Sequence, residues 1–153
     1  MLIRDGNLFE SEATTLVNPV NCSGVVTKGL ALEFAGRYPD MLTEYQAMCQ
    51  SKKIKPGNPH FYVDTTGISV LNFPVRKHWQ SAVKLSYIAR GLEWIRENYE
   101  KLGITSIAFP ALGCGLAGLQ FQHVSGLIAA ILGDLPIDVE VYAPLSHKLE
   151  EEG

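Results

Sequence analysis

The sequence of 153 residues has few cysteines, no long apolar run and no excess of basic side chains. Its three cysteines, Cys22, Cys49 and Cys114, lie far apart and lack CxxC spacing, which argues against a disulfide framework and against a zinc site. No apolar stretch approaches the roughly 20 residues that cross a bilayer, and no charged-then-apolar leader follows Met1. We therefore expect a cytoplasmic protein with no bound metal and no membrane partner.

The charge balance limits the kind of partner that the protein binds. Thirteen Lys and Arg residues stand against sixteen Asp and Glu residues, which gives a net charge of −3. A protein without a broad positive field holds a polynucleotide only through local contacts. Any nucleic-acid site must therefore be built from a small group of side chains.

Two periodicities alternate along the chain. Short runs rich in β-branched residues predict six strands, and stretches with apolar residues three and four apart predict four amphipathic helices. We expect strands at Leu2–Arg4, Thr14–Val20, His60–Asp64, Ser69–Phe73, Ser106–Phe109 and Val139–Tyr142, and helices at Lys28–Phe34, Asp40–Gln50, Leu85–Tyr99 and Phe121–Leu132. This pattern predicts one α/β domain over residues 1–153, with helices on both faces of a parallel or mixed sheet.

Two glycine-bearing segments, Asn21–Gly29 and Leu112–Gly118, each lie between a predicted strand and a predicted helix. In such sheets, loops at the carboxyl ends of strands leave backbone N–H groups pointing at one crevice, where they bind anions without positive side chains. A single glycine also serves merely to shape a turn. Because the two loops occur as a pair, we interpret them as the walls of a cleft for a diphosphate-containing nucleotide.

Three side chains near these loops have alternative interpretations. Asn18 is interpreted as a turn cap, whereas Asn21 opens the first loop and has an amide that donates to and accepts from a ribose hydroxyl. Cys114 is either a nucleophile or a small side chain packed under a phosphate. Since no partner histidine is indicated, we favour packing for Cys114. For Asn21 we favour the sugar contact.

The segment Asn72–Trp79 closes a predicted strand with the densest grouping of cationic and aromatic side chains in the chain. From composition alone it is either a site of chemistry or an exposed basic loop anchored by Trp79. A lysine is a nucleophile only when it is neutral; neighbouring Arg76 and partial burial favour the neutral form, whereas a bound phosphate opposes it. The sequence leaves both interpretations open.

Taken together, these segments resemble the macrodomain family over nearly the whole chain. The residues that carry the likeness are Asn18-Pro19-Val20-Asn21-Cys22, Lys28-Gly29-Leu30-Ala31-Leu32-Glu33-Phe34, Asn72-Phe73-Pro74 with His78-Trp79, and Leu112-Gly113-Cys114-Gly115-Leu116. The combination is similar to the DarG type, the DNA ADP-ribosyl glycohydrolase antitoxins, and to the related animal terminal ADP-ribose protein glycohydrolase. The resemblance implies a three-layer α/β/α sandwich with a mixed central sheet, and ADP-ribose lying across its crest with the diphosphate between the two loops.

The resemblance also implies an activity, which is hydrolysis of the N-glycosidic bond between ADP-ribose and a DNA base, without a cofactor. The implied partners are ADP-ribose, ADP-ribosylated single-stranded DNA and a cognate ADP-ribosyltransferase toxin. The implied residues are Lys77, Arg76 and Asn21 for catalysis; Asn7, Leu8, Asn21, Gly24, Val25, Val26, Thr27, Lys28, Gly29, Leu112, Gly113, Cys114, Gly115, Leu116, Ala117 and Tyr142 for ADP-ribose; and His78 and Trp79 for nucleic acid. The alternatives are a non-catalytic ADP-ribose reader and a hydrolase of ADP-ribosylated protein.

Three departures from the family pattern carry consequences. Arg76 stands where the family has lysine; Lys77 substitutes one residue later, although a shift of one residue turns a side chain to the opposite face unless the chain bends. Asn7 replaces an aspartate that accepts from the adenine amino group, so we expect weaker adenine selection. Ala117 matches an acidic residue of the animal enzyme, which removes one general acid or base. Tyr142 packs either against the base or in the core.

Overall fold

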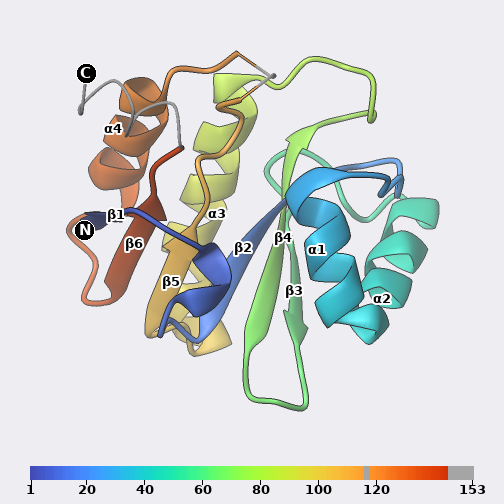
Figure 1. Ribbon diagram of the computed structural model, residues 1–153, viewed down its shortest axis with the longest axis horizontal. Helices are drawn as coiled ribbons and strands as arrows, with labels where there is room; N and C mark the ends of the chain where they lie inside the picture. The colour runs from blue at the N-terminus through green and yellow to red at the C-terminus, as the bar shows by residue number, and fades with distance from the viewer. Residues whose placement is uncertain (116–117, 145–153) are drawn as a thin grey trace.

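One six-stranded sheet forms the centre of the computed structural model, which describes residues 1–115 and 118–144 (Figure 1). Its order is β1-β6-β5-β2-β4-β3. The strands are β1 (Leu2–Arg4), β2 (Thr15–Asn21), β3 (His60–Val63), β4 (Ser69–Arg76), β5 (Ser106–Phe109) and β6 (Asp138–Tyr142). Neighbouring strands are parallel except β3, which pairs antiparallel with β4 at one edge. The carboxyl ends of the parallel strands β2, β4 and β5 therefore lie together at one end of the sheet.

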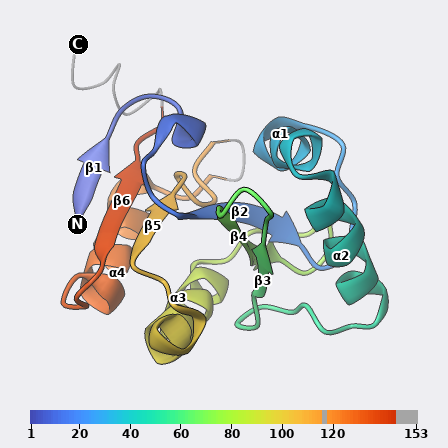
Figure 2. The same ribbon diagram turned by 90° about the horizontal axis from the view of Figure 1, so that it is seen from below.

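Within the described residues, four α-helices cover the sheet, two on each face (Figure 2). On one face lie α1 (Gly29–Arg37) and α2 (Pro39–Gln50), and on the other lie α3 (Leu85–Leu102) and α4 (Phe121–Leu132). The predicted α/β/α sandwich with a mixed sheet is confirmed, as are the six strands and four helices. Across residues 1–115 and 118–144, no helix is long and apolar enough to span a bilayer.

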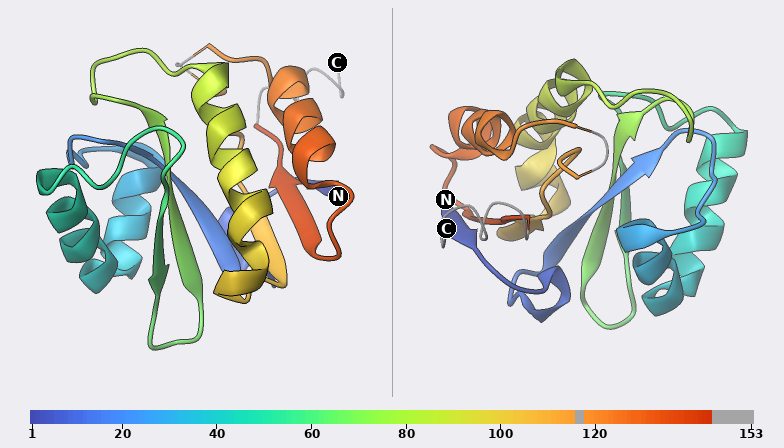
Figure 3. Two further views of the ribbon diagram at one scale, coloured as in Figure 1. Left: turned by 180° about the vertical axis from the view of Figure 1, so that it is seen from behind. Right: turned by 45° about the horizontal axis from the view of Figure 1, so that its top comes forward.

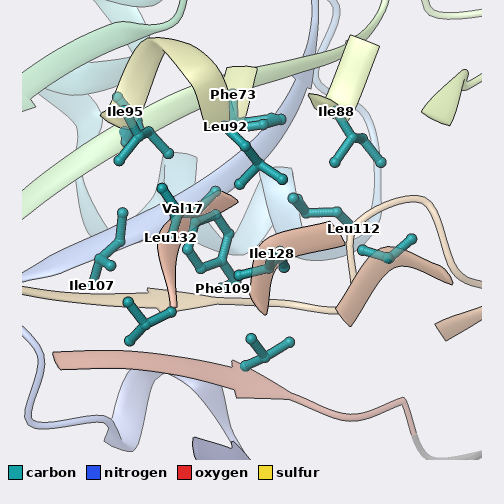
Figure 4. Packing of buried hydrophobic residues seen from close by; sticks show 14 of the residues in the cluster. Val17, Phe73, Ile88, Leu92, Ile95, Ile107, Phe109, Leu112, Ile128 and Leu132 are labelled. Atoms are coloured by element: carbon teal, nitrogen blue, oxygen red, sulfur yellow. The ribbon is translucent and has the colours of Figure 1, made fainter. Parts of the chain in front are cut away.

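Alternating side chains of the central strands divide the core into two layers. On β2, Leu16 packs in the cluster with α1 and α2, whereas Val17 packs in the cluster with α3 and α4. Figure 4 shows the second layer, in which Phe73 and Phe109 from the sheet meet Leu92 and other apolar residues of the helices. Because successive side chains point to opposite faces, a shift of a strand by one residue would exchange the side chains of its two faces. This alternation therefore fixes the register of each strand in the sheet.

Strand β4 runs three residues beyond its predicted end at Phe73, through Pro74 to Arg76. Proline is tolerated there because β3 pairs with β4 only as far as Asn72, which leaves that side of β4 without a strand partner. Two helices also run three residues beyond their predicted ends, α1 to Arg37 and α3 to Leu102, and a short 3-10 helix, η1 (Leu8–Glu10), precedes β2.

Asn18 does not cap a turn, because it lies inside β2 with its side chain 2% exposed. Its amide nitrogen donates to Asn72 at 3.0 Å, and Asn72 lies 3.1 Å from His60 Nδ1. The three residues are register partners on β2, β4 and β3. Their side chains therefore form a polar row across the buried sheet, which ends in a 3.0 Å contact between His60 Nε2 and Glu44 of α2.

The packing of α3 on β4 gives a stability prediction at Gly91. A Cβ at this position lies only 2.3 Å from the ring of Phe73, so Gly91→Ala forces the helix away from the strand. We expect it to lower the free energy of unfolding by about 1–3 kcal/mol, despite the better helix propensity of alanine. The matched control is Gly126→Ala in α4, where a Cβ meets nothing within 4 Å. Equal urea midpoints for the two variants would contradict this packing.

Candidate functional site

A cleft of about 530 Å³ lies where the carboxyl ends of β2 and β4 meet the loop that follows β5. Figure 3 (right) turns this end of the molecule forward. The volume is within the range of sites that hold small ligands. The cleft is lined by Pro19, Val20, Asn21, Val25, Val26, Thr27, Lys28, Gly29, Leu30, Ala31, Tyr45, Val75, Arg76, Trp79, Val83, Ala111, Gly113, Cys114 and Gly115.

The loop after β2 is organised by the Asn21 side chain. Its Oδ1 accepts hydrogen bonds from the backbone N–H groups of Ser23 and Gly24, both at 3.0 Å, and its Nδ2 donates to the Val25 carbonyl at 2.9 Å. The hydroxyl of the buried Tyr45, on α2, donates a hydrogen bond to the Asn21 carbonyl at 2.7 Å. Asn21 therefore fixes the loop, and one hydrogen of its amide nitrogen is used within the protein. The predicted sugar contact would use the second.

The same loop leads into the start of α1, which forms one wall of the cleft. Lys28 precedes the helix with extended backbone and makes no side-chain cap. Gly29, the first helical residue, has φ +66°, a conformation that favours glycine. The first turn of a helix has N–H groups without partners inside the helix, and its dipole favours negative charge. This wall is therefore suited to an anion such as a phosphate.

The loop after β5 forms the opposite wall and contains three glycines with positive φ. Gly113, Gly115 and Gly118 have φ of +69°, +100° and +86°. The Gly113 carbonyl accepts from the Leu119 N–H at 3.0 Å, which closes the loop on itself. Leu116 and Ala117, which we expected to contact ADP-ribose, lie outside the described residues. The described part of the loop presents backbone to the cleft, as an approach by a phosphate requires.

Arg76 and Lys77 point in different directions at the end of β4. The strand pairs run from Val20–Pro74 to Asn21–Arg76, so Val75 is the extra residue of a bulge. Arg76 is half-buried and lines the cleft, and its Nη1 donates to the Trp79 carbonyl at 3.2 Å. Lys77 is exposed and does not line the cleft.

The Lys77 ammonium nitrogen instead lies 6.0 Å from the centre of the Tyr87 ring on α3. Its backbone carbonyl accepts from the Cys22 N–H at 3.1 Å, which ties the end of β4 to the first loop. The bulge does not turn Lys77 into the position that Arg76 occupies. Of these two cations at the end of β4, only Arg76 therefore lines the cleft, where Lys28 of the first loop is a second lining cation.

Trp79 and His78 follow directly in the loop that begins α3. Trp79 is 44% exposed and lines the cleft, and the two rings are tilted by 36° with their centres 5.9 Å apart. His78 does not line the cleft, and its Nδ1 accepts from the Gln80 N–H at 3.3 Å. An exposed tryptophan at the mouth of a cleft is a platform on which a nucleobase stacks.

The residues expected at the adenine end do not line the cleft. Asn7 uses its amide oxygen to accept from the Phe9 N–H at 2.9 Å, so it caps η1. Leu8 and Tyr142 are 5% and 8% exposed and pack together with α1 and α2 in the core. Gly24 and Leu112 also do not line the cleft; Leu112 is fully buried. The contacts of these five residues with ADP-ribose stay a prediction.

The environment of Cys114 favours packing over nucleophilic chemistry. Its side chain is 6% exposed, and burial raises the pKa of its thiol to about 11. Burial, with a smaller effect of neighbouring Cys49, likewise raises the pKa of the Cys22 thiol to about 11. A thiol with so high a pKa is protonated at neutral pH and is a poor nucleophile.

These two thiols predict a loss of stability at alkaline pH. Their pKa values rise from the ordinary 9.0 to about 11 on folding, so the unfolded chain releases protons first as pH increases. Their stabilising contribution is complete below pH 9 and falls away between pH 9 and 11. We expect urea titrations to show that the unfolding free energy of the wild type falls more over this pH range than that of Cys22→Ser/Cys114→Ser. A constant difference from neutral pH upwards would show that the thiols are not perturbed.

The sequence did not point to several residues of the cleft. Tyr45, which holds the first loop, follows the ordinary apolar periodicity of α2, and Val83 and Ala111 are small apolar residues without a motif. Of the predicted contacts, the cleft brings together Asn21, Val25, Val26, Thr27, Lys28, Gly29, Arg76, Trp79, Gly113, Cys114 and Gly115. Among these described lining residues there is no carboxylate and no imidazole.

The Macro domain family matches residues 17–128 of the chain. The chain is 36% identical to a "DNA ADP-ribosyl transferase-DNA ADP-ribosyl glycohydrolase fusion protein" of Thermosipho africanus, over 96% of this chain and 42% of that protein. It is 37% identical to the "DNA ADP-ribosyl glycohydrolase" of Mycobacterium tuberculosis, over 97% of this chain and 43% of that protein. The chain therefore spans less than half the length of these curated relatives.

Solved structures give the same result for the fold. The macrodomain of Thermus aquaticus DarG superposes with a TM-score of 0.88 at 33% identity, covering 94% of this chain and 97% of that one. Thermosipho africanus DarTG, solved in complex with ADP-ribose, also gives a TM-score of 0.88, at 37% identity, covering 94% of this chain and 41% of that one.

Proposed function

This chain belongs to the Macro domain family, and from that premise we propose that it binds ADP-ribose and hydrolyses the N-glycosidic bond linking ADP-ribose to a DNA base. The names of the curated relatives and the ADP-ribose complex of the Thermosipho africanus protein support this substrate. The cleft supports it physically, because the start of α1 and the glycine-bearing loop after β5 form its walls, and both kinds of backbone suit a phosphate group.

The observation that carries the proposal is the position of Arg76. Its guanidinium lines the cleft at the end of β4, where the bulge places it opposite Asn21 of the first loop. The Trp79 carbonyl accepts a hydrogen bond from Arg76 Nη1 and so helps to fix the orientation of the guanidinium group. A fixed cation of this kind stabilises charge that develops during a reaction without the need to reorganise.

The reaction breaks the bond from the anomeric carbon to the base nitrogen, and the bonding electron pair goes to the base. A water oxygen forms the new bond to the anomeric carbon. One water proton ends on the base nitrogen, and the other stays in the hydroxyl of free ADP-ribose. We assign to Arg76 the stabilisation of the negative charge on the departing base, because a guanidinium stays protonated at neutral pH and is no nucleophile.

The modified base would leave the cleft past Trp79, which we propose as its stacking platform, with His78 and Lys77 contacting the strand. The partner that creates the substrate would be an ADP-ribosyltransferase, a pairing that the fusion-protein name supports. All three cysteines are free thiols, which agrees with a cytoplasmic location.

The second candidate is a reader that binds ADP-ribose and releases it unchanged. Arg76 in place of the family's lysine favours it, as does the absence of carboxylate and imidazole groups among the described residues of the cleft.

The test compares three substrates at equal concentration: a single-stranded DNA oligonucleotide carrying ADP-ribose on a base, an ADP-ribosylated protein, and free ADP-ribose as the binding control. We expect release of ADP-ribose from the oligonucleotide, read by chromatography, and binding of free ADP-ribose by calorimetry. Binding without release from any substrate would identify the reader. Release from the protein alone would replace DNA as the substrate.

A further inference from the structure

Positive charge is concentrated in one third of the chain. Residues 45–92 contain seven Lys and Arg residues against a single acidic residue, Asp64, a net charge of seven minus one, or +6. The other residues contain six Lys and Arg and fifteen Asp and Glu, a net charge of −9. One of the seven cations is Arg76 in the cleft. The other six, Lys52, Lys53, Lys55, Lys77, Lys84 and Arg90, are all exposed, and we call them the basic face.

Three members of the basic face surround one aromatic ring next to the cleft. The Nζ atoms of Lys77 and Lys84 and the Cζ atom of Arg90 lie 6.0, 5.4 and 5.9 Å from the centre of the Tyr87 ring. No two of these cations are therefore separated by more than twice 6.0 Å. Cations this close to a tyrosine ring are attracted to its face but repel one another.

The charges of this cluster are not neutralised by the protein. Among residues 1–115 and 118–144, none of the three cations is within 4.0 Å of a carboxylate oxygen, whereas Arg4, Arg37 and Arg96 each have an acidic partner. Exposed like charges held within about one Debye length of each other favour a bound anion. The cluster therefore lacks the counter-charge that these three arginines have.

The basic face continues from this cluster onto the loop between α2 and β3. A Cβ at Gly57 lies 3.1 Å from the Arg90 Cβ, so this loop packs directly against α3. The loop carries the exposed Lys52, Lys53 and Lys55. Figure 3 (left) shows the segment after α2 passing beside α3 on this side of the molecule. The six cations thus belong to neighbouring segments.

The basic face adjoins the cleft through the chain itself. Lys77 follows Arg76, and Lys84 follows Val83, and both Arg76 and Val83 line the cleft. Trp79 lies between them at the mouth. A base stacked on Trp79 would therefore have its flanking phosphates beside the cluster around Tyr87.

We propose that the basic face binds the phosphodiester backbone of the DNA strand that carries the modified base, leading it from the cleft across Tyr87 toward Arg90 and the loop at residues 52–55. This inference rests on the proposed function, because it specifies how that substrate is held. A strand of nucleic acid supplies regularly spaced phosphates and bases that stack on an aromatic side chain, which match the row of cations and Trp79 together.

The first test measures binding of an unmodified single-stranded oligonucleotide over a range of salt concentrations by fluorescence anisotropy. Lys84→Gln/Arg90→Gln removes two phosphate contacts outside the ADP-ribose cleft. We expect about tenfold weaker binding and a slope of log affinity against log salt that is less steep by about 1.4, at 0.7 for each contact. The charge-retaining variant Lys84→Arg/Arg90→Lys should bind as wild type does.

The matched control is Arg96→Gln/Lys101→Gln, which removes the same charge from the distal half of α3. It should leave the affinity and the salt slope at the wild-type values. If this control weakens oligonucleotide binding equally, the effect depends only on the net charge of the protein, and the proposal is overturned. Wild-type affinity in Lys84→Gln/Arg90→Gln, or binding to anionic lipid vesicles but not to the oligonucleotide, would overturn it as well.

The second test separates this inference from the proposed activity. With an ADP-ribosylated oligonucleotide, Lys84→Gln/Arg90→Gln should lower kcat/KM about tenfold with kcat unchanged, whereas an ADP-ribosylated mononucleoside should be hydrolysed at the wild-type rate. If wild type releases no ADP-ribose from either substrate, the proposed activity fails. The binding measurements with the unmodified oligonucleotide would still decide whether the basic face binds DNA. Equal losses on both substrates would contradict backbone binding.

Discussion

Arg76→Ala is expected to lower kcat for release of ADP-ribose from DNA about 100-fold or more, while the affinity for free ADP-ribose changes by no more than a few fold. The guanidinium lines the cleft at the end of β4 and is oriented by the Trp79 carbonyl. Removing one fixed charge-stabilising group from an active site typically costs a factor of 10² to 10³ in kcat. Affinity should persist because, in the proposed function, the backbone of the two loops holds the diphosphate.

Arg76→Lys and Lys77→Ala are the matched variants. Arg76→Lys keeps a cation at the cleft and puts an amine where the family has one, so it should be at least about tenfold faster than Arg76→Ala. Lys77→Ala should stay within a few fold of wild type on a mononucleoside substrate, because the Lys77 ammonium lies beside Tyr87 rather than in the cleft. Single-turnover kinetics with calorimetry in parallel measure both quantities. Loss of release in Lys77→Ala with full activity in Arg76→Ala would reverse the assignment.

Gly113→Val is expected to weaken ADP-ribose binding at least about 100-fold. Gly113 has φ +69°, which a β-branched residue adopts only with strain, and a Cβ there lies 2.7 Å from Leu119 Cδ1 and Val83 Cγ1. The loop must therefore shift, and its backbone groups leave the positions from which we propose that they contact ADP-ribose. Calorimetric titration with ADP-ribose measures the effect directly.

Gly67→Val separates backbone strain from loss of the site. Gly67 has φ +92° in the turn between β3 and β4, and a Cβ there meets nothing within 4 Å. Both variants should lower the free energy of unfolding by about 1–3 kcal/mol. Only Gly113→Val should lose affinity, and equal ADP-ribose affinity in the two variants would contradict a ligand-binding role for the second loop.

Much of the architecture was predictable because local patterns and tertiary packing agree. The stripe of apolar residues along α3 and the β-branched runs of the strands correspond to the faces that are buried in the structure. The pairing of two glycine loops also predicted the position of the cleft, since parallel strands bring their carboxyl ends to one edge.

The details that sequence reasoning missed depend on pairing between distant segments. The bulge at Val75 is defined by the register of β4 against β2, and only that register decides that Arg76 rather than Lys77 lines the cleft. Asn18 appeared to be a cap because its partner, Asn72, is far away in sequence. Tyr45 likewise reaches the first loop from another helix, with no local pattern to mark it.

The role of Arg76 is tested by the rate at which the wild-type chain releases ADP-ribose from an ADP-ribosylated single-stranded oligonucleotide at several pH values from 6 to 9. A guanidinium keeps its charge over this range, so we expect release at a nearly constant rate. A rate that rises about tenfold for each pH unit would indicate a nucleophilic amine that must lose a proton, and would contradict the role given to Arg76. No release at any pH, with ADP-ribose binding intact, would contradict the hydrolase itself.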